Sequence, residues 1–210
     1  MKSRVAFGVS LGLPEEQAET LARLKSPEAV QDFITDLRIN AEAGGDTCLP
    51  VTETLRQRHA HCIEGAFVAA CALWMAGEKP LLMDMQAASG DHDHVIALFQ
   101  RNGCWGAISK SNHVWVRWRD PIYRSLRELA ISYFNEYCLG DRKTLRNYSA
   151  SIDLRRFPPG EWVAGRESCW EVGAALDDAR HYPLLSPGQE RSLKSRDRME
   201  MRADKIVEYR

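Results

Sequence analysis

The sequence has no long apolar run. No stretch of the 210-residue chain approaches the roughly 20 apolar residues that a membrane-spanning helix needs. The apolar part of the first segment, residues 5–13, is short and is interrupted by glycine and serine, and no small-residue cleavage site follows it, which argues against a secretion signal. We therefore expect a cytoplasmic protein that has no membrane as its partner.

The chain also lacks an excess of charge of either sign. Its 28 Lys and Arg residues nearly balance its 29 Asp and Glu residues, and the net charge is −1. Binding to nucleic acid depends on an excess of positive charge, so no nucleic-acid partner is expected. Residues 113–119 alternate aromatic side chains and arginines, which can stack on bases, but on a strand this pattern is more typical of one packed and one polar face.

Cysteines occur without paired spacing. The six cysteines lie at positions 48, 62, 71, 104, 138 and 169, and no two of them form a CxxC motif. This argues against a zinc ribbon and against a small disulfide scaffold. Reduced thiols are the simpler interpretation, and we expect no cofactor.

The first 80 residues have the spacing of helices. Ser26 and Pro27 suit the start of one helix, whose apolar positions continue to residue 37. A second helix is expected to begin at Cys62 and to end before Gly77 and Pro80. It is built of small and apolar residues, which let other backbones approach closely, so we expect it to lie deep in the core.

The period changes after residue 80. Residues 80–86, 94–100, 104–109 and 113–118 are short, apolar and rich in β-branched or aromatic residues, which predicts strands. Asn102-Gly103 is a two-residue hairpin signal. Asp120-Pro121 is interpreted as the start of a further helix. Helices followed by an antiparallel sheet indicate the α+β class.

The composition changes again after Gly140. The segments at 155–162 and 181–190 are rich in proline and glycine, and residues 191–210 are strongly charged. We therefore divide the chain into a core at 1–140 and a C-terminal extension at 141–210, which packs on the core or on a partner.

Cys62 has the most informative surroundings of any residue. A thiol at a helix N-terminus lies at the positive end of the helix dipole, which favours the thiolate. His94 begins an apolar strand, and one imidazole can take a proton from a thiol and return it to a leaving group. The pair is typical of a cysteine nucleophile with its base. The alternative is a buried structural cysteine and a loop histidine. We expect His94, rather than His92 in the preceding loop, to approach the sulfur.

Three segments resemble, in order, the transglutaminase-like superfamily of the papain-like fold. Residues 52–80 are similar to that family's helix bearing a nucleophilic cysteine, residues 94–99 to its strand beginning with the catalytic histidine, and residues 102–109 to the next hairpin strand. The resemblance implies a papain-like α+β core in which the cysteine helix packs on an antiparallel sheet. It also implies an enzyme that forms a thioester: a hydrolase or acyl transferase acting on a peptide, a protein or a small amide or ester.

The third member of that family's triad is usually Asp, and here it is atypical. Counting from Trp105 puts Ser109 at its position, and a strict two-residue turn puts Ser109 on the same face as His94. Asn112 lies on the opposite face unless a bulge intervenes, but its amide oxygen is the better acceptor for an imidazole N–H. We favour Asn112 as the residue that orients His94 and keep Ser109 as the alternative.

Two other classes of function remain open from the sequence. The missing Asp favours a non-catalytic transglutaminase-like module that binds a peptide or protein. The short spacings His59-x-His61-Cys62 and His92-x-His94 supply ligands that suit zinc. Against this, two histidines spaced His-x-His point the same way only on a strand, and residues 59–62 cross from a loop into a helix.

Overall fold

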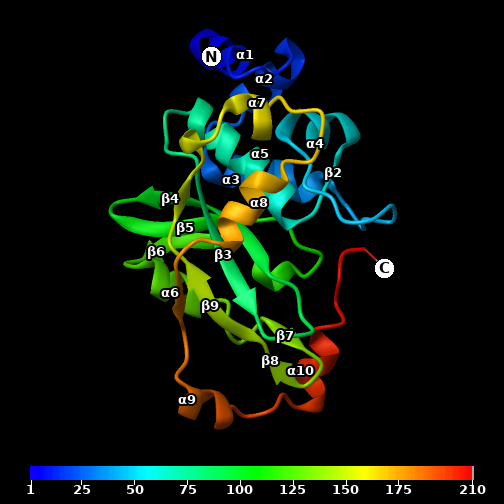
Figure 1. Cartoon of the computed structure of the whole chain (residues 1–210), viewed down its shortest axis with the longest axis vertical. Coiled ribbons are helices and arrows are strands. Elements are labelled where there is room, and N and C mark those ends of the chain that lie inside the picture. Colours follow the sequence, from blue (N-terminus) through cyan, green and yellow to red (C-terminus); the bar gives the residue numbers. More distant parts are fainter. Residues whose placement is uncertain (210) are drawn as a thin grey trace.

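An antiparallel sheet forms the middle of the molecule in the computed structural model, which describes residues 1–209 (Figure 1). Its strands follow the order β11-β9-β3-β4-β5-β6, and β10 also pairs with β3. These strands are β3 (Leu81–Ala87), β4 (His94–Arg101), β5 (Cys104–Ile108), β6 (Arg119–Tyr123), β9 (Leu145–Ser149), β10 (Ile152–Asp153) and β11 (His181–Pro183). The α+β class predicted from the sequence is confirmed: an antiparallel sheet packs against helices.

Helices precede the sheet in the chain. They are α1 (Lys2–Ser10), α2 (Glu15–Ala22), α3 (Pro27–Asp36), α4 (Val51–Gln57) and α5 (Cys62–Met75). Helix α3 begins as the sequence predicts, because the Ser26 hydroxyl accepts a hydrogen bond from the Ala29 N–H and Pro27 fills the first helical position. The parallel strands β1 (Arg38–Ile39) and β2 (His59–Ala60) lie between these helices in the chain.

Helix α5 is buried on almost every side. Its residues from Glu64 to Leu73 are all buried, as expected of a helix with apolar and small residues around its whole circumference. It packs on the sheet face that carries Val95, Ala97 and Phe99. The opposite face, with Ile96 and Leu98, belongs to a separate core cluster that includes residues of α6 (Leu126–Ile131).

The hairpin between β4 and β5 has the predicted register. Asn102 and Gly103 both have positive φ, 52° and 77°, as a tight two-residue turn with this sequence requires. Arg101 pairs with Cys104 across the turn. The two strands remain paired as far as Ala97 and Ile108, so the residues after Ile108 leave the ladder close to the start of β4.

The segment that follows β5 differs from its prediction. Residues expected to form a strand at 113–118 contain a 3₁₀ turn, Val114–Val116, and the expected helix start at Asp120-Pro121 lies inside β6. Strand β6 is at the edge of the sheet, where a proline without an N–H is tolerated. The helix begins only at Leu126, capped by the Ser125 hydroxyl.

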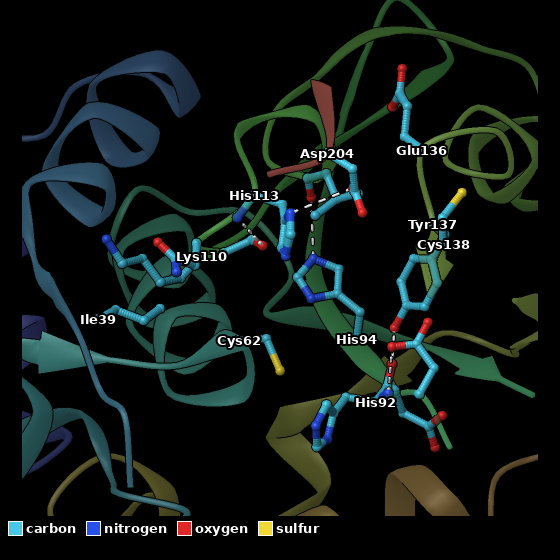
Figure 2. A pocket seen from close by; sticks show the side chains of 15 residues that line it. Ile39, Cys62, His92, His94, Lys110, His113, Glu136, Tyr137, Cys138 and Asp204 are labelled. Atoms are coloured by element: carbon cyan, nitrogen blue, oxygen red, sulfur yellow. Dashed lines mark hydrogen bonds and ion pairs between the residues drawn. The ribbon is translucent and has the colours of Figure 1, made fainter. Parts of the chain in front are cut away.

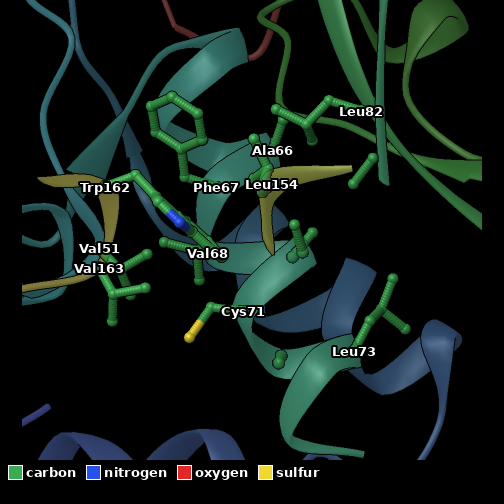
Figure 3. Packing of buried hydrophobic residues seen from close by; sticks show 14 of the residues in the cluster. Val51, Ala66, Phe67, Val68, Cys71, Leu73, Leu82, Leu154, Trp162 and Val163 are labelled. Atoms are coloured by element: carbon green, nitrogen blue, oxygen red, sulfur yellow. The ribbon is translucent and has the colours of Figure 1, made fainter. Parts of the chain in front are cut away.

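Residues after 140 contribute to the sheet and to its core. Strand β9 pairs with β3, and β11 pairs with β9. Trp162 is fully buried against Phe67 of α5 (Figure 3), and its ring also stacks on that of Trp74. The remaining elements are α7 (Pro159–Trp162), α8 (Trp170–Asp177), α9 (Pro187–Arg191), α10 (Arg198–Ala203), the 3₁₀ turn Leu154–Arg156 and the short pair β7 (Cys138–Leu139) and β8 (Arg142–Lys143).

No helix within residues 1–209 is long and apolar enough to cross a bilayer. All six cysteines are free thiols, and the buried Cys48 and Cys169 sulfurs lie 3.8 Å apart.

Candidate active site

Cys62 is the first residue of α5, as the sequence predicts. The N–H groups in the first turn of a helix have no partner within the helix and carry partial positive charge, which stabilises a thiolate. The thiol lines a cavity of about 300 Å³ together with His94, Lys110 and Tyr137 (Figure 2). Cys62 therefore combines a reactive position with access to a cleft.

His94 is the first residue of β4 and is buried. Its Nε2 lies 3.1 Å from the Ser109 hydroxyl and 3.2 Å from the Val116 carbonyl oxygen. A carbonyl oxygen only accepts, so Nε2 carries a proton and donates it. In the neutral ring the free lone pair is then on Nδ1, and the imidazole faces the same cavity as the Cys62 sulfur (Figure 2). This is the tautomer that a base for the thiol needs.

Ser109 is fixed by its own contacts. Its hydroxyl donates to the carbonyl oxygen of Val116 at 2.9 Å or of Arg117 at 3.1 Å, which leaves its lone pairs for His94. The side-chain amide of Gln31, on α3, accepts from the Ser109 N–H and donates to the Ser109 carbonyl, both at 3.0 Å. Gln31 thus replaces a neighbouring strand at the point where β5 leaves the sheet.

A second imidazole lies beside the thiol. Nδ1 of His61 is 3.9 Å from the Cys62 sulfur, and its Nε2 is 2.8 Å from the Thr47 carbonyl oxygen. Because this carbonyl oxygen can only accept, Nε2 of His61 carries the proton, as in His94. In the neutral ring the lone pair is then on Nδ1, which is the nitrogen nearer the sulfur. Carboxylate oxygens of Glu64 and Glu42 lie 3.4 and 3.5 Å from Nε2 and favour the protonated ring.

Glu64 anchors this corner of the site. Its side chain is completely buried in the third position of α5 and accepts hydrogen bonds from the main-chain N–H groups of His61 and Leu49 and from the side chains of Thr47 and Asn40. A buried carboxylate is tolerated when its lone pairs are occupied in this way. The carboxylate holds the loop before α5 against the helix.

The surroundings lower the pKa of the Cys62 thiol. Burial acts to raise it, but hydrogen bonds to His61 and His94 and the positive charge of both rings act more strongly and lower the pKa to about 5. Burial likewise acts to lower the pKa of His61, while its hydrogen bond to Cys62 and the charges of Cys62 and Glu64 raise that pKa to about 9. Between these values the pair is a thiolate beside an imidazolium.

Asn112 does not contact His94, which corrects the expectation that it orients the ring. Its amide nitrogen donates to the carbonyl oxygen of Tyr209, and its amide oxygen accepts from the Tyr209 N–H, both at 2.8 Å. The strand parity derived from the Asn102-Gly103 turn explains this result. No bulge intervenes between Gly103 and Ile108, so Ser109 stays on the face of His94.

His92 lines the same cavity as Cys62 and His94, but its side chain hydrogen-bonds to neither of them (Figure 2). It is exposed on the loop before β4, and its carbonyl oxygen accepts from the Tyr137 hydroxyl. His59 is not among the residues that line the cavity. Nε2 of His59 is buried with no hydrogen-bond partner. Within residues 1–209, no three side chains of His, Cys, Asp or Glu form a group that could hold a metal ion.

Several residues of the site were missed by sequence reasoning. His61 was considered only as a metal ligand, although the spacing His61-x-x-Glu64 at a helix start is that of a capping box and points to both residues. Tyr137, whose ring centroid lies 6.4 Å from that of His94, lies outside the segments that the sequence singles out for the site. Lys110 had no sequence signal, because it lies in the polar run after β5.

Comparison with models of known protein families and with curated proteins finds no match to this chain.

Proposed function

We propose that this protein is a cysteine-dependent acyl-transfer enzyme of transglutaminase-like, papain-like architecture, acting on an amide or ester. The observation that carries the proposal is the fixed tautomer of His94 beside a thiol at a helix N-terminus. The two groups line one cavity. Resemblance of the segments around Cys62 and His94 to that superfamily points the same way.

The reaction divides into two steps. The Cys62 thiolate attacks the carbonyl carbon, a C–S bond forms, and the main-chain N–H of Cys62 is one donor to the oxyanion. The C–N or C–O bond then breaks while the imidazolium of His94, which holds the proton taken from the Cys62 thiol, gives that proton to the leaving group. Water or an amine, deprotonated by the same imidazole, attacks the thioester and releases the thiolate.

The two histidines have different tasks in this proposal. His61, with carboxylates at its far nitrogen, holds the positive charge that stabilises the thiolate. His94 moves the proton. His94 has no hydrogen bond from its ring to an Asp, and this matters less because a carbonyl oxygen fixes the tautomer and an imidazolium is already supplied by His61.

An activated ester tests the proposal directly. After incubation with p-nitrophenyl acetate we expect a burst of nitrophenolate and an acetyl group located on Cys62 by peptide mass spectrometry. Cys62→Ala is expected to abolish both, and Cys71→Ala, on the same helix, is the matched control that retains them. The absence of an acetyl-Cys62 species would contradict the proposal and leave the non-catalytic binding module as the better account.

A further inference from the structure

The strip of chain from Lys110 to Arg117 holds another segment of the protein in the manner of a bound peptide. Residues 207–209 lie against it after α10, where Figure 1 shows the C-terminal segment returning toward the helical part of the molecule. His113 and Val207 form an antiparallel bridge. The Glu208 N–H donates to the Asn112 carbonyl oxygen at 3.2 Å. The contact is therefore of the strand-addition type.

Asn112 clamps the main chain of this segment. Its side-chain amide donates to the carbonyl oxygen and accepts from the N–H of the same residue, Tyr209, at 2.8 Å each. These hydrogen bonds recognise an extended main chain and do not depend on which side chain the residue carries. Any extended peptide with the same direction satisfies them equally well.

Two cations contact the side chain of Glu208, which lies between the residues held by main-chain contacts, Val207 and Tyr209. The guanidinium of Arg117 forms an ion pair with Glu208, and the Lys110 ammonium lies 4.0 Å from the same carboxylate oxygen. Lys110 is fully buried, and its ammonium donates hydrogen bonds to the neutral carbonyl oxygens of Thr35 and Leu37. The centroid of the Tyr209 ring lies 5.5 Å from the same ammonium. A buried ammonium is costly unless an anion lies nearby, so this position favours a carboxylate.

The strip also belongs to the cavity of the thiol. Lys110, Ser111, Asn112 and His113 line the same cavity as Cys62. A peptide bound on the strip therefore lies at the rim of the reactive cleft.

We propose that residues 110–117 form a peptide-binding subsite of the Cys62 cavity, which takes an extended segment with an acidic side chain, and that residues 207–209 occupy this subsite as an internal competitor. Its part in substrate selection rests on the proposed acyl-transfer function. The binding itself does not depend on that function.

Fluorescence anisotropy with full-length protein in a Cys62→Ala background tests binding apart from chemistry. The probe is a labelled, amidated peptide with the sequence of residues 204–209, Asp-Lys-Ile-Val-Glu-Tyr, and its matched partner has Gln in place of Glu. The protein carries Glu208→Gln, which weakens the hold of its own segment. We expect the Glu peptide to bind this variant about tenfold more tightly than the Gln peptide, and more tightly than it binds protein with Glu208 intact.

Adding Arg117→Ala is expected to remove the preference for Glu, whereas Arg101→Ala, at a surface ion pair with Glu78 at the other end of β4, is expected to keep it. Equal binding of the two peptides, or no saturable binding, overturns the proposal. That comparison uses the Glu208→Gln protein, so it holds even if Arg117→Ala fails to fold. A preference for Glu that survives in a folded Arg117→Ala variant overturns the assignment of the subsite. If the Glu peptide is preferred but no acetyl-Cys62 species forms, the proposed acyl-transfer function is contradicted while the peptide-binding subsite is supported.

Discussion

Helix α5 carries two thiols in opposite surroundings. Cys62 begins the helix at the cavity, where two imidazoles interact with its sulfur, and its pKa is lowered to about 5. Cys71 lies about two and a half turns further along, fully buried in the apolar core, and burial raises its pKa to about 12. The residue type and the helix are the same. Position along the helix, through the partners that it supplies, decides whether the thiol is a nucleophile or a core residue.

The largest expected effect is the difference in reactivity between these two thiols. At pH 7 Cys62 is almost entirely thiolate, while Cys71 is thiolate to about one part in 10⁵. The intrinsic nucleophilicity of a thiolate falls with its pKa, by about three orders of magnitude between the pKa of Cys71 and that of Cys62. This offsets part of the difference in thiolate fraction, so we expect iodoacetamide to modify Cys62 about a hundredfold faster than Cys71.

Mass spectrometry of timed digests measures this ratio. Cys62→Ala is expected to remove the fast modification and Cys71→Ala to keep it. Comparable rates at the two thiols would show that the helix N-terminus and the imidazoles do not activate Cys62.

Close packing at the reactive end of α5 is the next test. A Cβ at Gly65 would lie 2.6 Å from the Lys110 Cβ and 3.3 Å from Cγ2 of Ile34. We therefore expect Gly65→Ala to lower the free energy of unfolding by about 1–3 kcal/mol. Gly44→Ala is the control, because no atom lies within 4 Å of the Cβ there, and we expect a change of less than about 0.5 kcal/mol. Urea denaturation measures the free energy of unfolding of both variants. Equal changes in the two would contradict the close approach of Lys110 to α5 at Gly65.

A smaller effect separates the two histidines. The thiolate of Cys62 is present above its pKa and is lost as pH falls through about 5, so the alkylation rate falls with it. His61→Ala removes a charged hydrogen-bond partner and is expected to raise this midpoint by about one to two pH units, which shifts the whole pH profile of alkylation upward by the same interval.

His94→Ala is the informative companion variant. We expect it to retain rapid alkylation at pH 7 but to lose turnover of an acyl substrate, because the ring that moves the proton is absent. A pH profile unchanged by His61→Ala would refute the division of tasks between the histidines.

The smallest effect concerns the orientation of His94. Ser109→Ala removes one acceptor of the Nε2 proton and leaves the Val116 carbonyl oxygen, so acetylation by p-nitrophenyl acetate is expected to slow about fivefold, equivalent to about 1 kcal/mol. Asn112→Ala, whose side chain contacts Tyr209 instead, is expected to slow it less. A greater loss in Asn112→Ala would restore the original expectation.

Local patterns in the sequence predicted much of the scaffold. The start of α3 at Ser26-Pro27, the start of α5 at Cys62 and the turn at Asn102-Gly103 depend on caps and backbone preferences within a few residues, and the structure has all three. The helix start predicted at Asp120 is wrong, because a proline on an edge strand and a proline at a helix start give the same local signal. The strand predicted at 113–118 is also wrong, since this segment contains a 3₁₀ turn.

The sequence by itself determined where the thiol stands, because a helix N-terminus is set by neighbouring residues. Only the tertiary structure decided what surrounds it. Gln31, Val116 and Thr47 come from separate parts of the chain, and each acts through a contact that periodicity cannot reveal. The side chain that orients His94 was decided in the same way, since hairpin register brings Ser109 to the ring while the C-terminal segment takes Asn112. Local order follows from propensity, whereas the partners of a buried polar group follow from which distant segments pack together.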